Sequence, residues 1–193
     1  MALNIFPIPA DGFRLSPVEQ RYAPLFCFAL LTICCALASF SLACATPFAA
    51  FAVVAAASLP LRPALLVAAG AWLVNQAIGF GVHHYPTDST TIIWGLAIGA
   101  GAIAATAASV AAQRILPLNR TPLVLALTLV CAYGADELVL FAATPILGGA
   151  GAFRAAIIAR LGLLNVVWLI GLVATCEIVR LLNPFRGGRA VST

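Results

Sequence analysis

The sequence predicts an all-α, polytopic membrane protein that folds as a bundle of six transmembrane helices. Hydrophobic residues make up 63% of the chain and charged residues 8%, whereas charged residues make up about 25% of a typical soluble domain. The apolar runs are long and lack the apolar/polar alternation that the strands of a membrane barrel need. Backbone polar groups in lipid must pair internally, so helices are the expected way across the bilayer.

Six apolar segments follow one another along the chain, and each is expected to cross the membrane. They cover residues 24–44, 47–59, 64–82, 91–112, 122–143 and 155–182. A spanning helix needs about 20 apolar residues, so the second segment is short and could instead be re-entrant or interrupted. The predicted organisation is a cytoplasmic arm over residues 1–22, a transmembrane domain over 23–183 and a cytoplasmic tail over 184–193.

The arginines indicate the orientation of the bundle, because cytoplasmic loops collect positive charge. The chain has ten basic residues, and all of them are arginine. With both termini inside (N-in/C-in), eight of the ten lie on the inner side, and only Arg154 and Arg160 lie outside. If segment 47–59 did not cross, the later loops would change sides, and the arginines would no longer be concentrated on one side of the membrane. The arginines therefore favour six crossings.

Small residues in segment 91–112 are spaced for close helix packing. Gly95 and Gly99 form a GxxxG pair, and such spacing lets two helix backbones approach closely. Packing inside the bundle is one interpretation. A docking face for a partner membrane protein is the other.

Residues 75–95 gather most of the candidate binding residues, and the predicted orientation puts them at the outer face. Asn75 and Gln76 lie within a helix, where their amides need hydrogen-bond partners from other helices or from a ligand. His83 and His84 are the two histidines of the chain. Three roles stay open for them, namely interfacial polarity, metal ligation and a response to pH.

The fifth segment carries two acids, Asp136 and Glu137, inside an apolar run. Insertion of Asp at a helix centre costs about 2.5–3.5 kcal/mol, so such residues usually mark a function or a specific pairing. An ion pair with Arg160 is one expectation. Ligand contact or proton coupling is the other, and Asn165 in the sixth segment could join this polar set.

No enzymatic activity is expected from the motifs. The chain lacks a Gly-x-Ser-x-Gly elbow, a phosphate-binding loop and an HExxH metal motif. No intrinsic cofactor is expected. The arginines are scattered singly rather than clustered, so no nucleic-acid partner is expected either.

The chain length, the six expected helices and one motif carry a resemblance to a known family. The motif is Asn75-Gln76-Ala77-Ile78-Gly79-Phe80, followed by Tyr85-Pro86 and Trp94-Gly95. The chain resembles the substrate-binding S components of energy-coupling-factor (ECF) transporters, in particular the small BtuM-like vitamin B12 uptake proteins of Gram-negative bacteria. The likeness covers most of the chain in architecture, but only this segment in motif.

The resemblance implies a multi-pass protein of the bacterial inner membrane that binds a vitamin, cobalamin or another corrinoid, and mediates its uptake. Loops and outer helix ends would form a periplasm-facing pocket. The partners would be the lipid bilayer, the small-molecule vitamin and either an ECF scaffold subunit with two ATPases or none. Mapped on this chain, the candidate ligand-binding residues are Asn75, Gln76, Phe80, His83, His84, Tyr85, Asp136 and Arg154.

The chain departs from the family at the cobalt ligand. Some members ligate the cobalt of cobalamin through a cysteine near the outer end of the third helix. This sequence has Val82, His83 and His84 there, and either histidine could substitute as the axial ligand. Cys44 lies outside the motif. Two other functions stay open, namely a membrane assembly or interaction protein that uses Gly95 and Gly99, and a proton-coupled small-solute carrier that uses Asp136 or Glu137.

Overall fold

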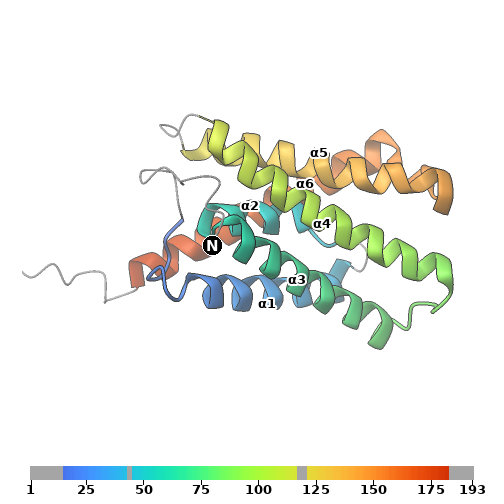
Figure 1. Cartoon of the computed structure of the whole chain (residues 1–193), viewed down its shortest axis with the longest axis horizontal. Helices are drawn as coiled ribbons and strands as arrows, with labels where there is room; N and C mark the ends of the chain where they lie inside the picture. Colours follow the sequence, from blue (N-terminus) through green and yellow to red (C-terminus); the bar gives the residue numbers. More distant parts are fainter. Residues whose placement is uncertain (1–14, 43–44, 117–120, 183–193) are drawn as a thin grey trace, which may run out of the picture.

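The computed structural model describes residues 15–42, 45–116 and 121–182, and these residues form helices without a strand. Residues 1–14 of the expected arm, Cys44 and the expected tail lie outside the described residues. The helices form one elongated bundle (Figure 1). Their bounds are α1 Ala23–Leu42, α2 Phe48–Ser58, α3 Leu61–Gly81, α4 Ser89–Ile115, α5 Thr121–Leu147, the short 3-10 helix η2 Ala150–Phe153 and α6 Ala155–Leu182.

Five helices are long and apolar enough to cross a membrane, which confirms the prediction of an α-helical membrane protein. These are α1, α3, α4, α5 and α6, with 20 to 28 residues each. The second expected segment forms α2, which has 11 residues. A helix of that length rises about 16 Å, at 1.5 Å per residue, and is too short to span a hydrocarbon core of about 30 Å.

Helix α2 lies at the centre of the bundle. Ten of its 11 residues are buried, and it packs against all five long helices. Its sequence consists of Ala, Val and Phe except for Ser58 at its end, so the helix is apolar on nearly every side. The second segment therefore forms the core of the bundle rather than a lipid-facing span.

The helices alternate in direction, so both described chain ends lie at the same end of the bundle (Figure 1). Leu15 donates its backbone N–H to the carbonyl oxygen of Ala57 at 2.9 Å, which places the chain start beside the end of α2. We call this the termini end. The opposite end, called the loop end, carries residues 82–88 and 148–154 (Figure 1).

The lateral surface of the bundle is apolar. Large hydrophobic side chains such as Leu66, Leu138 and Ile170 are 65–73% exposed. A soluble monomer rarely exposes large continuous apolar patches, whereas lipid tails solvate them readily. This surface fits a bilayer as its surroundings.

Gly95 and Gly99 face α3 inside the bundle. The indole nitrogen of Trp72 donates to the carbonyl oxygen of Gly95 at 2.8 Å. A Cβ at Gly99 would lie 2.6 Å from Cε2 of Trp72, and one at Gly95 would overlap Oε1 of Gln76. The GxxxG pair is used for packing between α3 and α4, so these glycines are not open to a partner protein.

Candidate binding site

A pocket of about 80 Å³ lies at the loop end between α3, α4 and the segment that joins them. We call it the loop-end pocket. Its lining comprises Asn75, Gln76, Phe80, Tyr85, Thr91, Trp94, Gly95 and Ile98. The segment 75–95 that the sequence singled out therefore folds back on itself around one pocket.

Local contacts hold the wall of this pocket in place. The ring of Tyr85 lies against Gly79, where a Cβ would come within 2.8 Å of the ring. Asp88 caps α4, since Oδ1 accepts the backbone N–H of Thr91 at 3.0 Å and Oδ2 accepts its hydroxyl at 2.7 Å. The bonds from Thr91 lower the pKa of Asp88, because they favour the charged carboxylate. This cap fixes Thr91 at the rim of the pocket.

Asn75 and Gln76 form a chain of hydrogen bonds that leads from the pocket into the bundle. Gln76 donates Nε2–H to Oδ1 of Asn75 at 3.1 Å. Asn75 donates Nδ2–H to the hydroxyl oxygens of Ser39 and Thr46, both at 2.9 Å. The Asn75 amide thus joins α1, α3 and the chain that enters α2, while both Asn75 and Gln76 line the pocket.

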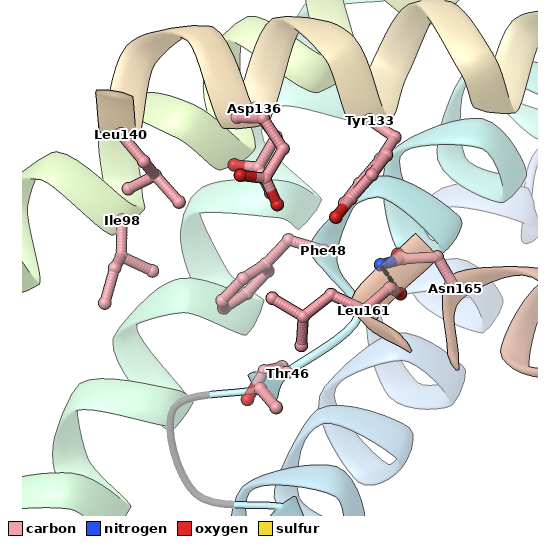
Figure 2. A pocket seen from close by; sticks show the side chains of 10 residues that line it. Thr46, Phe48, Ile98, Tyr133, Asp136, Leu140, Leu161 and Asn165 are labelled. Carbon is pink, nitrogen blue, oxygen red and sulfur yellow. Dashed lines mark hydrogen bonds between the residues drawn. The ribbon is translucent and has the colours of Figure 1, made fainter. Parts of the chain in front are cut away.

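A second cavity, of about 50 Å³, lies deeper in the bundle where α2 begins. Its polar lining consists of Thr46, Tyr133, Asp136, Glu137 and Asn165. Figure 2 shows Tyr133 and Asp136 projecting from the same helix toward Phe48 at the start of α2. We call it the acidic cavity. Ile98 lines both cavities, and Thr46 links the acidic cavity to Asn75.

Asp136 fits between the helices because Gly101 of α4 has no side chain. A Cβ at Gly101 would overlap Oδ1 of Asp136. Arg154 and Arg160 are exposed. The expected ion pair between an acid of α5 and Arg160 does not form, since within the described residues the ion pairs are Arg21–Glu19 and Arg180–Glu177.

Asn165 and Tyr133 attach α6 to the rest of the bundle. Oδ1 of Asn165 accepts the backbone N–H of Ala50 at 3.0 Å, and its Nδ2–H donates to the carbonyl oxygen of Leu161 at 3.0 Å. Tyr133 donates its hydroxyl to the carbonyl oxygen of Ile158 at 2.8 Å. Asn165 thereby satisfies an N–H in the first turn of α2, which has no partner within that helix.

The two histidines lie beside the loop-end pocket without lining it. Nε2 of His83 is 3.0 Å from the carbonyl oxygen of Ser39, and the His83 ring stacks on Tyr85 with centroids 5.8 Å apart. His84 is exposed and has a positive φ of 53°. In the described part of the chain, no three His, Cys, Asp or Glu side chains cluster as a metal site would require.

The eight candidate residues thus separate into three groups. Asn75, Gln76, Phe80 and Tyr85 line the loop-end pocket, Asp136 lines the acidic cavity, and His83, His84 and Arg154 lie outside both. Sequence reasoning missed the hydroxyls of Ser39, Thr46 and Thr91. Serine and threonine are common in and beside apolar helices, so nothing in the sequence distinguishes these three hydroxyls.

Comparison of the chain with protein-family models, with curated proteins and with solved structures found no match. The functional argument therefore starts from the two cavities, the hydrogen bonds between them and the apolar surface of the bundle. These features describe a membrane protein with two small cavities that buried hydrogen bonds connect.

Proposed function

We propose that this chain is a multi-pass transport protein of the bacterial inner membrane that binds a small-molecule substrate at its loop end and mediates the uptake of that substrate. The observation that carries the proposal is the loop-end pocket, where Gln76, Tyr85 and Trp94 converge around about 80 Å³. A concave site with aromatic walls and a few polar groups is typical of small-molecule binding.

The proposed orientation is N-in/C-in with six crossings, so the loop end faces the periplasm. The described arginines support it. Arg21, Arg62, Arg114 and Arg180 belong to the termini end, while Arg154 and Arg160 belong to the loop end. In this orientation the chain from Leu42 to Leu61 makes the second crossing, with α2 as its helical part.

The resemblance to the BtuM-like proteins makes cobalamin or a related corrinoid the substrate to test first. The loop-end pocket is small for such a ligand, since sites for drug-sized molecules measure about 300–1,000 Å³. A corrinoid would therefore sit over the pocket after residues 82–88 have moved outward. The exposed His84 lies in this segment, and a shift there would also release His83 from Ser39, so either histidine would come within reach of cobalt.

Binding of cobalamin to the purified protein, measured by calorimetry, tests the proposal. We expect Gln76→Ala to weaken binding roughly 2- to 12-fold, the value of one hydrogen bond of about 0.5–1.5 kcal/mol. Gln20 is an exposed amide at the termini end, so Gln20→Ala is the matched control and should leave affinity unchanged. No binding at micromolar cobalamin would refute the corrinoid form of the proposal.

The visible spectrum of bound cobalamin tests the axial ligand separately. Replacing both His83 and His84 with Ala should change that spectrum if either imidazole ligates cobalt. An unchanged spectrum with intact affinity would remove the ligand role and leave the binding role in place.

Growth rescue tests uptake and its energy source. Expression in a bacterium that lacks its own inner-membrane B12 importer should restore B12-dependent growth. Rescue with the chain alone would indicate a solitary transporter, whereas rescue only with an added scaffold subunit and ATPases would indicate the ECF arrangement. Failure of both to restore growth would count against uptake of B12.

A proton-coupled small-solute carrier is the second candidate, and Asp136 and Glu137 in the acidic cavity favour it. This function requires uptake that persists without ATP and collapses when a proton ionophore is added. The third candidate, an assembly protein that docks through Gly95 and Gly99, is less favoured, because both glycines pack against α3.

A further inference from the structure

The acidic cavity holds two neighbouring acids inside the bundle. Asp136 and Glu137 both line this cavity of about 50 Å³, together with the hydroxyl-bearing side chains of Thr46 and Tyr133. Asp136 is 11 residues before the end of α5, so it lies about 16 Å below the loop end, at 1.5 Å per residue. This depth is well inside a hydrocarbon core of about 30 Å.

Among the described residues, no Arg side chain lines this cavity to compensate the acids. The groups that face Asp136 from its own helix are Tyr133 and Glu137. From α4 it faces Gly101 and Ile98, while the start of α2 and helix α6 present no titratable side chain to the cavity. In the described residues, the side chain of Asp136 takes part in no ion pair and no hydrogen bond.

Two of the other polar groups of the cavity make hydrogen bonds to other parts of the bundle. The single hydroxyl hydrogen of Tyr133 goes to the carbonyl oxygen of Ile158. The amide of Asn165 bonds Ala50 and Leu161. Two like-charged carboxylates at this depth would each cost about 2.5–3.5 kcal/mol and would also repel one another.

We propose that Asp136 and Glu137 form a proton-binding site whose occupancy changes when a substrate enters the loop-end pocket. The Asp136 carboxylate takes one proton from the outer aqueous phase and becomes a carboxylic acid, and it returns that proton to water in the reverse step. A proton fits this site better than a divalent metal ion, because the cavity offers two carboxylates and no third His, Cys, Asp or Glu within the described residues.

The connection between the two cavities is a short chain of side chains. Gln76 borders the loop-end pocket and donates to Asn75, which in turn donates to Thr46 in the wall of the acidic cavity. Ile98 lies between the cavities and contacts both spaces. A substrate that pulls on Gln76 thus displaces Thr46 through two hydrogen bonds. This coupling rests on the proposed uptake function, whereas the proton site itself does not.

Infrared difference spectroscopy on the purified protein without ligand tests the proton site. We expect a protonated-carboxyl band that titrates with pH, shifts in heavy water and disappears in Asp136→Asn. Asp136→Glu keeps a carboxyl group and should keep a titrating band. This variant shows whether a substitution at position 136 by itself misfolds the protein and so removes the band. Glu177→Gln, at the termini end beside Arg180, is the matched control and should keep the wild-type band.

The alternative outcomes overturn the site. A wild-type protein without a titrating carboxyl band, or a band that survives in Asp136→Asn, would refute it. Sodium ions that perturb the carboxylate bands at constant pH, with no titration of the carboxyl band, would show a sodium site in place of a proton site.

Proton release or uptake on addition of cobalamin, measured with an indicator dye in weak buffer, tests the coupling. We expect a pH change with the wild-type protein and its loss in Asp136→Asn with binding retained. Cobalamin binding without a titrating carboxyl would refute this inference and leave the proposed function standing. A titrating carboxyl without cobalamin binding would leave the proton site standing and refute the corrinoid form of the proposed function.

Discussion

Asp88 stabilises the start of α4 through both of its carboxylate oxygens, which bond Thr91. We expect Asp88→Ala to lower the thermal stability of the protein, because the first turn of the helix loses its cap. The bonds lower the pKa of Asp88 from its usual 3.8. The stabilisation is therefore full above pH 3.8 and is lost as the pH falls through the lower folded-state pKa.

Thermal unfolding of the helical signal in detergent, at neutral and at acidic pH, checks this expectation. Asp88→Ser keeps a side-chain oxygen at the cap and serves as the control, so it should unfold closer to the wild-type protein. An Asp88→Ala variant that unfolds at the wild-type temperature at neutral pH would show that the cap does not stabilise α4.

Asn165 is the residue that satisfies the start of the buried helix α2. We expect Asn165→Ala to destabilise the protein by about 1–3 kcal/mol, because the N–H of Ala50 is then left without its acceptor. Unfolding in mixed micelles with increasing denaturing detergent measures the change. Leu163 lies on the same helix and is 65% exposed, so Leu163→Ala is the control. Equal stability of the two variants would contradict the role of Asn165.

At the scale of the helices, Gly99 sets how closely α3 and α4 approach. In Gly99→Ala the new Cβ would lie 2.6 Å from Trp72, whose indole is held by its bond to Gly95 and cannot easily move away. We expect a cost of about 1–3 kcal/mol from overpacking, which exceeds the gain of about 0.5–1 kcal/mol from replacing a helical glycine by alanine.

Gly171 of α6 provides the matched control for that substitution. A Cβ at Gly171 meets nothing within 4 Å, so Gly171→Ala should leave stability unchanged or raise it by about 0.5–1 kcal/mol. Both variants are compared with the wild-type protein by thermal unfolding. If Gly99→Ala were as stable as Gly171→Ala, the contact between α3 and α4 would be looser than the structure indicates.

The positions of the long helices could be predicted from hydropathy, but their packing faces could not. The apolar segments 64–82 and 155–182 correspond closely to α3 and α6. Within such helices, buried Leu31 and 73%-exposed Leu66 are the same residue type. Lipid tails are as apolar as a protein core, so composition does not distinguish the two environments. For the same reason, the central position of α2 was not visible in its sequence.

In the candidate site, too, residues close together in the sequence could be grouped, whereas their partners from distant helices could not. Asn75, Gln76, Phe80 and Tyr85 lie within 11 residues of one another, so a local motif was enough to group them. The partners of this group come from far along the chain. Thr46 bonds Asn75 from 29 residues away, and Asn165 bonds Ala50 from 115 residues away. Such pairs depend on which helices become neighbours, and no pattern within one segment specifies that.

At the scale of the whole molecule, the two cavities and the described arginines give the bundle a polarity along its axis. The loop-end pocket and the acidic cavity are joined by Gln76, Asn75 and Thr46. Gln76 and Asn75 lie in the second half of α3, which ends at the loop end. The termini end carries Arg62 and Arg114 instead. A substrate that enters from the periplasm would therefore meet the binding pocket before the proposed proton site.

Labelling of introduced cysteines tests this orientation. We expect a membrane-impermeant maleimide to label Thr87→Cys in intact spheroplasts, because residues 82–88 lie at the loop end. Gln20→Cys and Leu116→Cys lie at the termini end and should react only after permeabilisation. Wild-type protein gives the background from its six native cysteines. Labelling of Gln20→Cys with protection of Thr87→Cys would reverse the orientation and place the loop-end pocket in the cytoplasm, which would contradict uptake from the periplasmic side.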